Sequence, residues 1–324
     1  MNSRKYWIDG LRGFAIILIV LGHFFQGFKF TLYIYIFHVP LFFVISGMCF
    51  NSSDSDIRTF FTKKIKSLIV PYFSFGIVVV PMAYLLEEDY TFHGFINVIF
   101  SYIIQRRFTT MWFLTTLFVT EIIFKLIHQQ AKNKNEMFRV ILILSSLFMV
   151  YEYIFNIDLP WNLDLSMICL LFYEIGYLIK ELKLIDKIKN KLNLGFLIGI
   201  LLSSLGILLG TISIRITSRR LDIFYGELGM PIIGILGAFF TCVGLVYISF
   251  CIPRIKILES IGCHTMSIFA LHQMVFKQLF MKILHFETKG GTMILMESCI
   301  TIILCYCIDI CITKSPLKWI IGKH

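Results

Sequence analysis

Charged residues are scarce in this chain. Only 15% of its 324 residues are Asp, Glu, Lys or Arg, whereas 57% are hydrophobic, and the mean hydropathy is +0.81. Soluble domains average about 25% charged and roughly 45–50% apolar residues. A soluble globular protein is therefore excluded, and a polytopic membrane protein is the class that fits.

Paired metal-ligand and disulfide patterns are also lacking. The nine cysteines lie within or at the ends of apolar runs, and none forms a C-x-x-C pair. This arrangement favours neither a zinc site nor a disulfide framework. We expect no metal and no permanently bound cofactor.

Acidic residues are few, with 20 Asp and Glu against 30 Lys and Arg. The basic residues gather in one alternate set of short loops, which by the positive-inside rule places both chain ends in the cytoplasm. These loops have no interleaved aromatic residues, so we expect no nucleic-acid partner. The predicted location is the cytoplasmic (inner) membrane, with the lipid bilayer as a partner.

Long apolar runs recur along the chain. A bilayer core of roughly 30 Å needs about 20 apolar residues, and ten such runs predict an all-α fold with about ten transmembrane helices. The segment 94–105 is shorter, and we expect it to lie at the interface or to re-enter. No linker interrupts the pattern, which predicts one membrane-embedded domain, 1–324, with no soluble appendage. The ten predicted spans are 11–28, 33–50, 66–86, 110–128, 138–155, 162–180, 195–213, 229–251, 264–285 and 292–313.

Two ionisable residues share one face of the first predicted helix. Arg12 and His23 are eleven residues apart, which puts them about 20° apart around the axis and about 16 Å apart along it. Asp9, one turn before Arg12, can orient its guanidinium. A guanidinium suits phosphate and an imidazole suits base catalysis, so the pair fits a long ligand with an anionic head, such as coenzyme A. The alternatives are a topological anchor for Arg12 and a packing role for His23.

A second histidine reaches a similar depth in the next predicted helix. His38 lies about five residues inside the span 33–50, and a short loop joins this span to the helix of His23. Two imidazoles at one depth are less expected by chance than either alone. Pro40 follows and can free a backbone carbonyl for a ligand.

The stretches "WIDGLRGFAIILIVLGH" (7–23) and "FHVPLFFVISG" (37–47) resemble the acyltransferase-3 superfamily of integral membrane acyltransferases, closest to its fucose 4-O-acetylase-like branch. "KKIKSLIVPYF" (63–73), "MWFLTTLF" (111–118) and "TMSIFALHQMVF" (265–276) support it, so the resemblance runs essentially end to end. It implies transfer of an acyl group, expected to be acetyl, from cytoplasmic acyl-CoA to a sugar hydroxyl. The implied acceptor is a cell-surface polysaccharide or a lipid-linked glycan precursor.

The resemblance also implies site residues. His23 matches the catalytic histidine, with Arg12 as the basic residue that precedes it, and His38 matches the histidine of the second motif. Trp112 and His272 match an aromatic residue and a histidine of the later motifs, and we take them as acceptor-site candidates.

Relatives often carry arginines before the third helix, where this chain has Lys63, Lys64 and Lys66. Together with Arg12 and Asp9, Lys63 and Lys64 are the candidates for binding the acyl-CoA donor. Lysine attracts phosphate as a point charge but cannot clamp it in a bidentate manner.

Other ionisable residues within the spans have no motif support. Glu174 is either a third acceptor-site candidate or the partner of Lys277 or another buried base. For Glu121, Glu297 and Asp309 we expect buried pairing.

The sequence leaves other questions open. His23 could act as a base in direct transfer or carry the acyl group transiently. A carrier or flippase for a lipid-linked glycan is the alternative function, although no inverted repeat is visible, and a non-catalytic scaffold leaves the Arg12–His23 face unexplained. Oligomeric state is not predicted.

Overall fold

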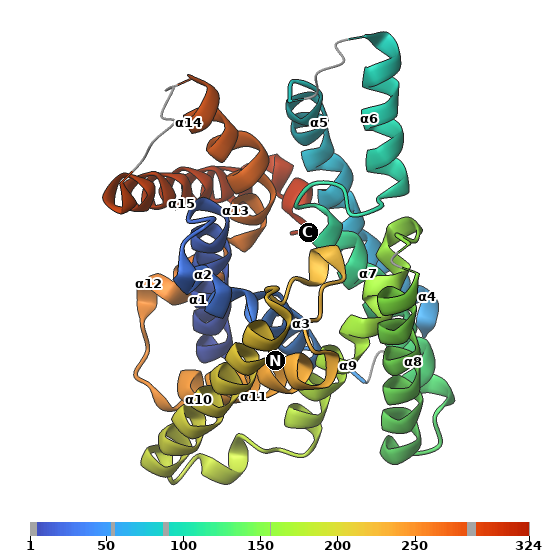
Figure 1. The fold of residues 1–324 in the computed structure, drawn as a ribbon, viewed down its shortest axis with the longest axis vertical. Coiled ribbons are helices and arrows are strands. Elements are labelled where there is room, and N and C mark those ends of the chain that lie inside the picture. The colour runs from blue at the N-terminus through green and yellow to red at the C-terminus, as the bar shows by residue number, and fades with distance from the viewer. Residues whose placement is uncertain (1–4, 53–55, 87–90, 156, 284–289, 324) are drawn as a thin grey trace.

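The computed structural model describes residues 5–52, 56–86, 91–155, 157–283 and 290–323, and these residues are almost entirely helical (Figure 1). Within them the only β pairing is one isolated bridge between Asp222 and Glu227. The helices of the first half are α1 (Tyr6–Phe24), α2 (Lys29–Tyr35), α3 (His38–Met48), α4 (Ile57–Lys64), η1 (Ile65–Ile69), α5 (Val70–Tyr84), α6 (Phe92–Ile104), α7 (Trp112–Gln130) and α8 (Lys134–Ile154). Those of the second half are η2 (Pro160–Asn162), α9 (Leu163–Glu181), η3 (Asp186–Ile188), α10 (Leu192–Thr217), η4 (Ile223–Tyr225), α11 (Pro231–Cys251), α12 (Lys256–Gly262), α13 (Thr265–Leu271), η5 (His272–Lys277), α14 (Gln278–Ile283), α15 (Gly291–Lys314) and η6 (Pro316–Ile321).

The prediction of an all-α polytopic membrane protein is confirmed. In the described parts of the chain, eight helical stretches are long and apolar enough to cross a bilayer, and each coincides with a predicted span. The other two predicted spans, 110–128 and 264–285, also contain helix in their described residues but are not among these eight. The first is α7, which carries two charged residues, and the second is α13–η5–α14, which changes helix type within its length. Positions 284 and 285 lie outside the described residues.

The third predicted span begins earlier than the sequence suggests. Helix starts at Ile57 rather than 66, because the Asp56 side chain caps it by accepting from the backbone N–H groups of Arg58 and Thr59, each at 3.1 Å. Hydrogen bonds to this carboxylate from the backbone N–H groups of Arg58 and Thr59, and from the Thr59 hydroxyl, lower the pKa of Asp56. The basic residues of 58–66 therefore project from a helix and not from a loop.

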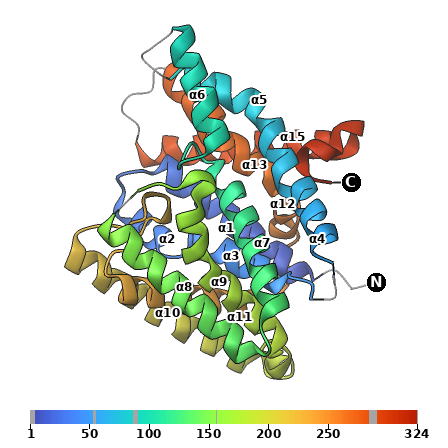
Figure 2. The same cartoon turned by 90° about the vertical axis from the view of Figure 1, so that its right-hand side faces the viewer.

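The segment 94–105 forms α6, a helix of 13 residues. At about 1.5 Å per residue it is too short to span a bilayer. Figures 1 and 2 both show it beside α5, and the hydroxyls of Tyr72 and Tyr102 each donate to the backbone carbonyl of the other residue. The segment thus returns along α5 as a helical hairpin.

The second predicted span is broken between α2 and α3. The break falls at Phe37, whose φ of −136° is not helical. Pro40 explains it, because a proline lacks the N–H that would bond four residues back and its ring crowds that carbonyl. His38 thereby becomes the first residue of α3.

Helix α1 packs against α3, α11, α12, α13 and α15 (Figure 1). Its contact with α12 is closest at Gly13 and Gly262. A Cβ at Gly13 would lie 2.0 Å from the carbonyl oxygen of Leu258, and one at Gly262 would lie 1.8 Å from that of Asp9. Only glycine fits at either position, so the backbone holds the Asp9–Arg12 turn against α12. The start of α1 and the end of η6 lie on the same side of the molecule (Figure 2).

Candidate active site

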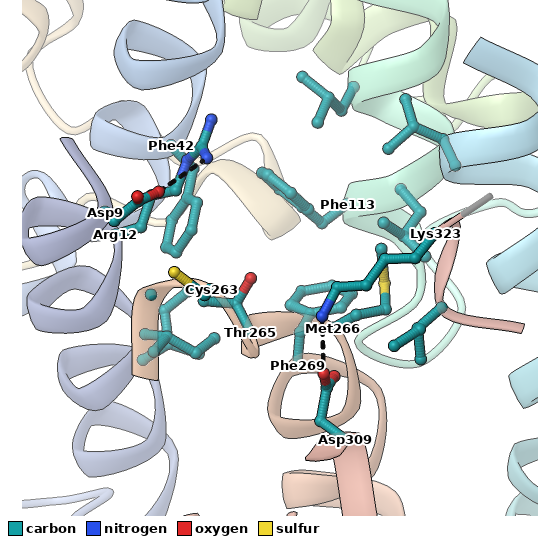
Figure 3. Close-up of a pocket in the computed structure, with 17 residues that line it drawn as sticks. Asp9, Arg12, Phe42, Phe113, Cys263, Thr265, Met266, Phe269, Asp309 and Lys323 are labelled. Atoms are coloured by element: carbon teal, nitrogen blue, oxygen red, sulfur yellow. Dashed lines mark hydrogen bonds and ion pairs between the residues drawn. The ribbon is translucent and has the colours of Figure 1, made fainter. Parts of the chain in front are cut away.

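A cavity of about 310 Å³ opens beside Arg12 on the side where α1 starts and η6 ends, and we call it the Arg12 cavity (Figure 3). Helix α1 supplies Asp9, Arg12, Ile16 and Ile19 to its wall, which shows that one face of α1 lines it. The remaining wall residues are Phe42, Leu68, Phe113, Leu114, Leu117, Gly262, Cys263, Thr265, Met266, Phe269, Asp309, Ile321 and Lys323.

Arg12 is held by two neighbours, Asp9 within this wall and Cys49 outside it. Its Nη1 lies 3.6 Å from Oδ1 of Asp9, and its Nη2 donates to the sulfur of Cys49 at 3.2 Å. One third of the Arg12 side chain remains exposed. The guanidinium is therefore oriented by Asp9, as the sequence predicts, and still reaches the cavity.

A second cation enters the same cavity from the opposite wall, where the chain returns after α15. Figure 3 shows Lys323 facing the Arg12 side across the cavity. Its Nζ donates to Oγ1 of Thr313 at 2.9 Å and lies 3.4 Å from Oδ1 of Asp309. Asp309 already accepts from His264 Nδ1 at 2.9 Å and from the backbone N–H of Ser267 at 3.0 Å. Lys323 is thus only loosely tied to the carboxylate, and Asp309 has the buried pairing that the sequence suggests.

The turn that delivers Lys323 depends on Gly322. This glycine has a φ of +74°, and a Cβ there would lie 2.8 Å from the carbonyl oxygen of Ser67 in η1. Buried Ile321, immediately before it, anchors the segment. The position of Lys323 therefore depends on a backbone turn that only glycine adopts without strain and on one buried apolar side chain.

The lysines predicted to hold the donor do not line the Arg12 cavity. Lys64 donates to Oε1 of Glu121 at 2.8 Å, which confirms the expected pairing of Glu121. Lys63 lines a separate surface hollow of about 280 Å³ together with Arg58 and Lys66. The basic helix start thus lies near the Arg12 cavity without forming its wall.

A second cavity, of about 330 Å³, lies at the other end of α1, and we call it the histidine cavity. His23, His38 and Trp112, all singled out from the sequence, line it together. The other wall residues are Gln26, Tyr35, Val39, Ala83, Leu86, Phe108, Thr109, Thr110, Arg220, Asp222, Phe224, Tyr225, Gln273 and Met274.

The tautomer of His38 follows from its neighbours. Its Nδ1 lies 3.0 Å from the carbonyl oxygen of Ile34, which can only accept, so Nδ1 carries the proton. Nε2 is then the unprotonated nitrogen. The Tyr35 ring packs edge-on against the imidazole, with centroids 4.6 Å apart.

The His272 ring packs against the His23 ring, and His272 lines neither cavity. It is fully buried, and its ring centroid lies 5.1 Å from that of His23. Nδ1 of His272 is 2.9 Å from the carbonyl oxygens of both Ile268 and Phe269.

Glu174 also lies away from both cavities. Its side chain is fully buried, and neither carboxyl oxygen has a hydrogen-bond partner among the described residues. The pairing with Lys277 is wrong, because Lys277 donates instead to the backbone carbonyl of His23 at 2.9 Å and to Gln26 at 3.1 Å. The structure does not explain the buried carboxyl of Glu174.

The loop between α10 and α11 adds an ion pair to the histidine cavity that sequence reasoning missed. Arg220 Nη2 lies 2.7 Å from Oδ2 of Asp222, and the Arg220 guanidinium stacks 4.1 Å above the centre of the Tyr35 ring. Burial raises the pKa of Asp222 to about 6, although Arg220 opposes the shift. The only signal in the sequence is a cluster of charges in a short loop, which usually indicates a solvated turn.

The two cavities are stacked end to end. On α1, on α3, on α7 and along the consecutive helices α13 and η5, a residue lining the Arg12 cavity is within about one turn of a residue lining the histidine cavity. The pairs are Ile19 and His23, Phe42 and Val39, Phe113 and Trp112, and Phe269 and Gln273.

Three phenylalanines of the Arg12 cavity wall each lie within about one turn of a residue that lines the histidine cavity. The Phe113 ring centroid lies 5.8 Å from that of Phe42 and 5.3 Å from that of Phe269. We call these three rings the phenylalanine layer. It lies where the cavity with two cations adjoins the cavity with two histidines.

This geometry agrees with a family match. The model of a family described as an acyltransferase domain, Acyl_transf_3, matches residues 5–312. This chain belongs to the Acyl_transf_3 family. It is a membrane acyltransferase. Searches of curated proteins and of solved structures find no match.

No cluster of three or more His, Cys, Asp and Glu side chains suited to a metal ion occurs in the described portion of the acyltransferase. The polar groups of the two cavities described above form two separate sets, one toward each end of α1. Arg12 and Lys323 can bind an anion by charge, whereas His23 and His38 can move a proton.

Proposed function

We propose that this acyltransferase moves an acetyl group from cytoplasmic acetyl-CoA to a hydroxyl of a cell-surface polysaccharide or a lipid-linked glycan precursor. The observation that carries the proposal is the stacking of the Arg12 cavity and the histidine cavity along one face of α1. Coenzyme A has the matching shape, with phosphates at one end and a thioester at the end of a long arm.

The donor would bind with its phosphates between Arg12 and Lys323. Both cations face the Arg12 cavity from opposite walls (Figure 3), and charge-assisted hydrogen bonds to phosphate are among the stronger ones. Arg12 and His23 are about 16 Å apart along α1, a span suited to the pantetheine arm. For the arm to pass, the ring of Phe113 must turn aside.

The acceptor hydroxyl would enter the histidine cavity from the opposite side of the membrane. Trp112 and Tyr225 offer aromatic surfaces there, and Arg220 and Asp222 offer hydrogen-bonding groups. Such a mixture suits the apolar faces and hydroxyl edges of a sugar ring.

The chemistry proposed is direct transfer with His23 as general base. The acceptor oxygen bonds to the thioester carbonyl carbon while its proton moves to His23. The carbon–sulfur bond then breaks, and His23 returns the proton to the departing CoA sulfur. His38, with an unprotonated Nε2, orients the acceptor sugar by accepting a hydrogen bond from a second hydroxyl of the same sugar.

Purified protein in lipid nanodiscs tests the proposal. It is supplied with acetyl-CoA labelled in the acetyl group and with polysaccharide prepared from the producing cells after chemical de-O-acetylation. We expect label in the polysaccharide and an acetyl ester in its mass spectrum. In sealed proteoliposomes, transport of a lipid-linked glycan without acetylation would instead support a carrier.

A further inference from the structure

His23 is contacted by two residues of one unusual helical turn. The segment η5, His272–Lys277, is a π-helix, in which hydrogen bonds run from residue i to i+5. In an α-helix, residues five apart would point about 140° apart. In a π-helix they lie above one another, so His272 and Lys277 face the same neighbour. Short π segments occur often at functional sites.

Both of these residues meet His23. The His272 ring lies beside the His23 ring, and Lys277 Nζ donates to the backbone carbonyl of His23 at 2.9 Å. That carbonyl belongs to the last turn of α1, where carbonyls lack helical partners and a cation is favourable. The π-helical turn therefore contacts both the side chain and the backbone of His23.

The hydrogen bonds of His272 determine its tautomer. Its Nδ1 faces two carbonyl oxygens, which can only accept, so Nδ1 carries the proton and Nε2 does not. Nε2 is buried and has no partner among the described residues, and the same holds for Nδ1 of His23. Two neighbouring imidazoles thus each have one buried, unpartnered nitrogen.

The spacing of the rings allows these nitrogens to satisfy each other. A nitrogen-to-nitrogen hydrogen bond spans about 2.9 Å, and each nitrogen is about 1 Å from its ring centre. The centroid separation of 5.1 Å matches that sum. The two ring planes are 49° apart, so the His23 ring must rotate for its Nδ1–H to point at Nε2 of His272.

We infer that His272 is the positioning residue of His23, accepting a hydrogen bond from His23 Nδ1–H through its own Nε2. The inference rests on the proposed role of His23 as base. The bond leaves Nε2 of His23 unprotonated and directed toward the histidine cavity. When His23 takes the acceptor's proton, the same bond stabilises the imidazolium. Lys277 holds the backbone of His23 in register.

Three substitutions separate this role from packing. His272→Ala removes the acceptor, and we expect kcat to fall about 10–100-fold, by analogy with the loss of a hydrogen-bond partner that orients a metal-binding histidine. The KM values for acetyl-CoA and polysaccharide should not change. His272→Gln retains an acceptor oxygen and should restore most of the activity, whereas His272→Phe retains ring volume and should not. A packing role predicts the reverse order of Gln and Phe and would overturn the inference.

A double variant tests whether His272 acts through His23. If it does, His23→Ala combined with His272→Ala should be no slower than His23→Ala alone. A further loss of similar size in the double variant would overturn the inference. His128→Ala is the matched control, because His128 is a helical histidine in an aromatic cluster that lines neither cavity.

Lys277 provides an independent test of the inference if the His272 variants do not fold. Lys277→Met keeps side-chain length but cannot donate to the His23 carbonyl, and we expect a lower kcat with unchanged KM. Unchanged kcat in Lys277→Met or in a folded His272→Ala would overturn the inference. If the parent protein itself has no transfer activity, the proposed function is overturned. If the parent is active and these variants keep its kcat, only the inference about His272 is overturned.

Discussion

The Arg12 cavity and the histidine cavity have similar volumes, about 310 and 330 Å³, and share the walls of α1, α3 and α7. Their chemistry differs. The first holds two cations, each near a carboxylate. The second holds two imidazoles among aromatic rings, with one Arg–Asp ion pair beside them. Under the proposed function, donor binding belongs to the Arg12 cavity and proton movement to the histidine cavity. Substitutions in the two cavities should therefore have different kinetic effects.

The largest effect is expected at His23. His23→Ala removes the proposed base, and loss of a general base typically slows a reaction about 10²–10⁴-fold. We expect kcat to fall by this factor while CoA binding, measured by isothermal titration calorimetry, remains. Near-normal transfer by a folded His23→Ala protein would contradict the assignment.

Arg12→Ala should act on binding instead. Hydrogen bonds to charged groups contribute about 1.5–3 kcal/mol, so the KM for acetyl-CoA should rise about 10–100-fold with kcat little changed. Raising the ionic strength should weaken donor binding in the parent, since phosphate attraction is screened by salt, and should do so less in the variant. An unchanged KM and salt response would mean that Arg12 is only a topological anchor.

Lys323→Ala should have a smaller effect of the same kind. Its side chain is 38% exposed, and exposed ion pairs contribute about 0.2–1 kcal/mol, so we expect a several-fold rise in the KM for acetyl-CoA. S-acetylpantetheine, which lacks the phosphates, should be used equally well by parent and variant. Lys318→Ala is the control, because Lys318 lies exposed in the same segment and does not line the cavity. Equal effects of the two variants would argue against a phosphate contact at Lys323.

The smallest effect concerns pH at the histidine cavity. Burial raises the pKa of Asp222 to about 6, so its carboxylate is ionised at pH 7 and largely protonated at pH 5. Protonation weakens the ion pair that holds Arg220, and transfer should decrease modestly as the pH falls through 6. Asp222→Asn should already be slow at pH 7 and show a smaller change between pH 7 and 5. An identical pH dependence in both proteins would show that Asp222 does not contribute.

Much of this molecule follows from local patterns. The membrane spans are set by apolar runs, because a lipid environment demands helices whose backbone groups are satisfied internally. The break before α3 and the shared depth of His23 and His38 follow from Pro40 and from a short loop. For Arg12 and His23, the helical repeat alone places both side chains on one face.

Contacts between residues from distant segments of the chain could not be predicted in this way. The lysines at 63 and 64 have the expected charge, yet Lys64 binds Glu121, while Lys323 reaches the Arg12 cavity from 311 positions further along the chain than Arg12. His272 matches a family motif, but only packing shows it behind His23 and not in the acceptor space.

The sequence by itself determined the membrane class, the helical fold and the line of ionisable side chains along α1, because composition and the 3.6-residue repeat act within one segment. Only the tertiary structure decided which charges meet which cavity, that Arg220 and Asp222 join the histidines, and that the phenylalanine layer lies where the two cavities adjoin. Those outcomes depend on how helices far apart in the chain pack together. A charge in lipid binds whichever partner the packing brings near.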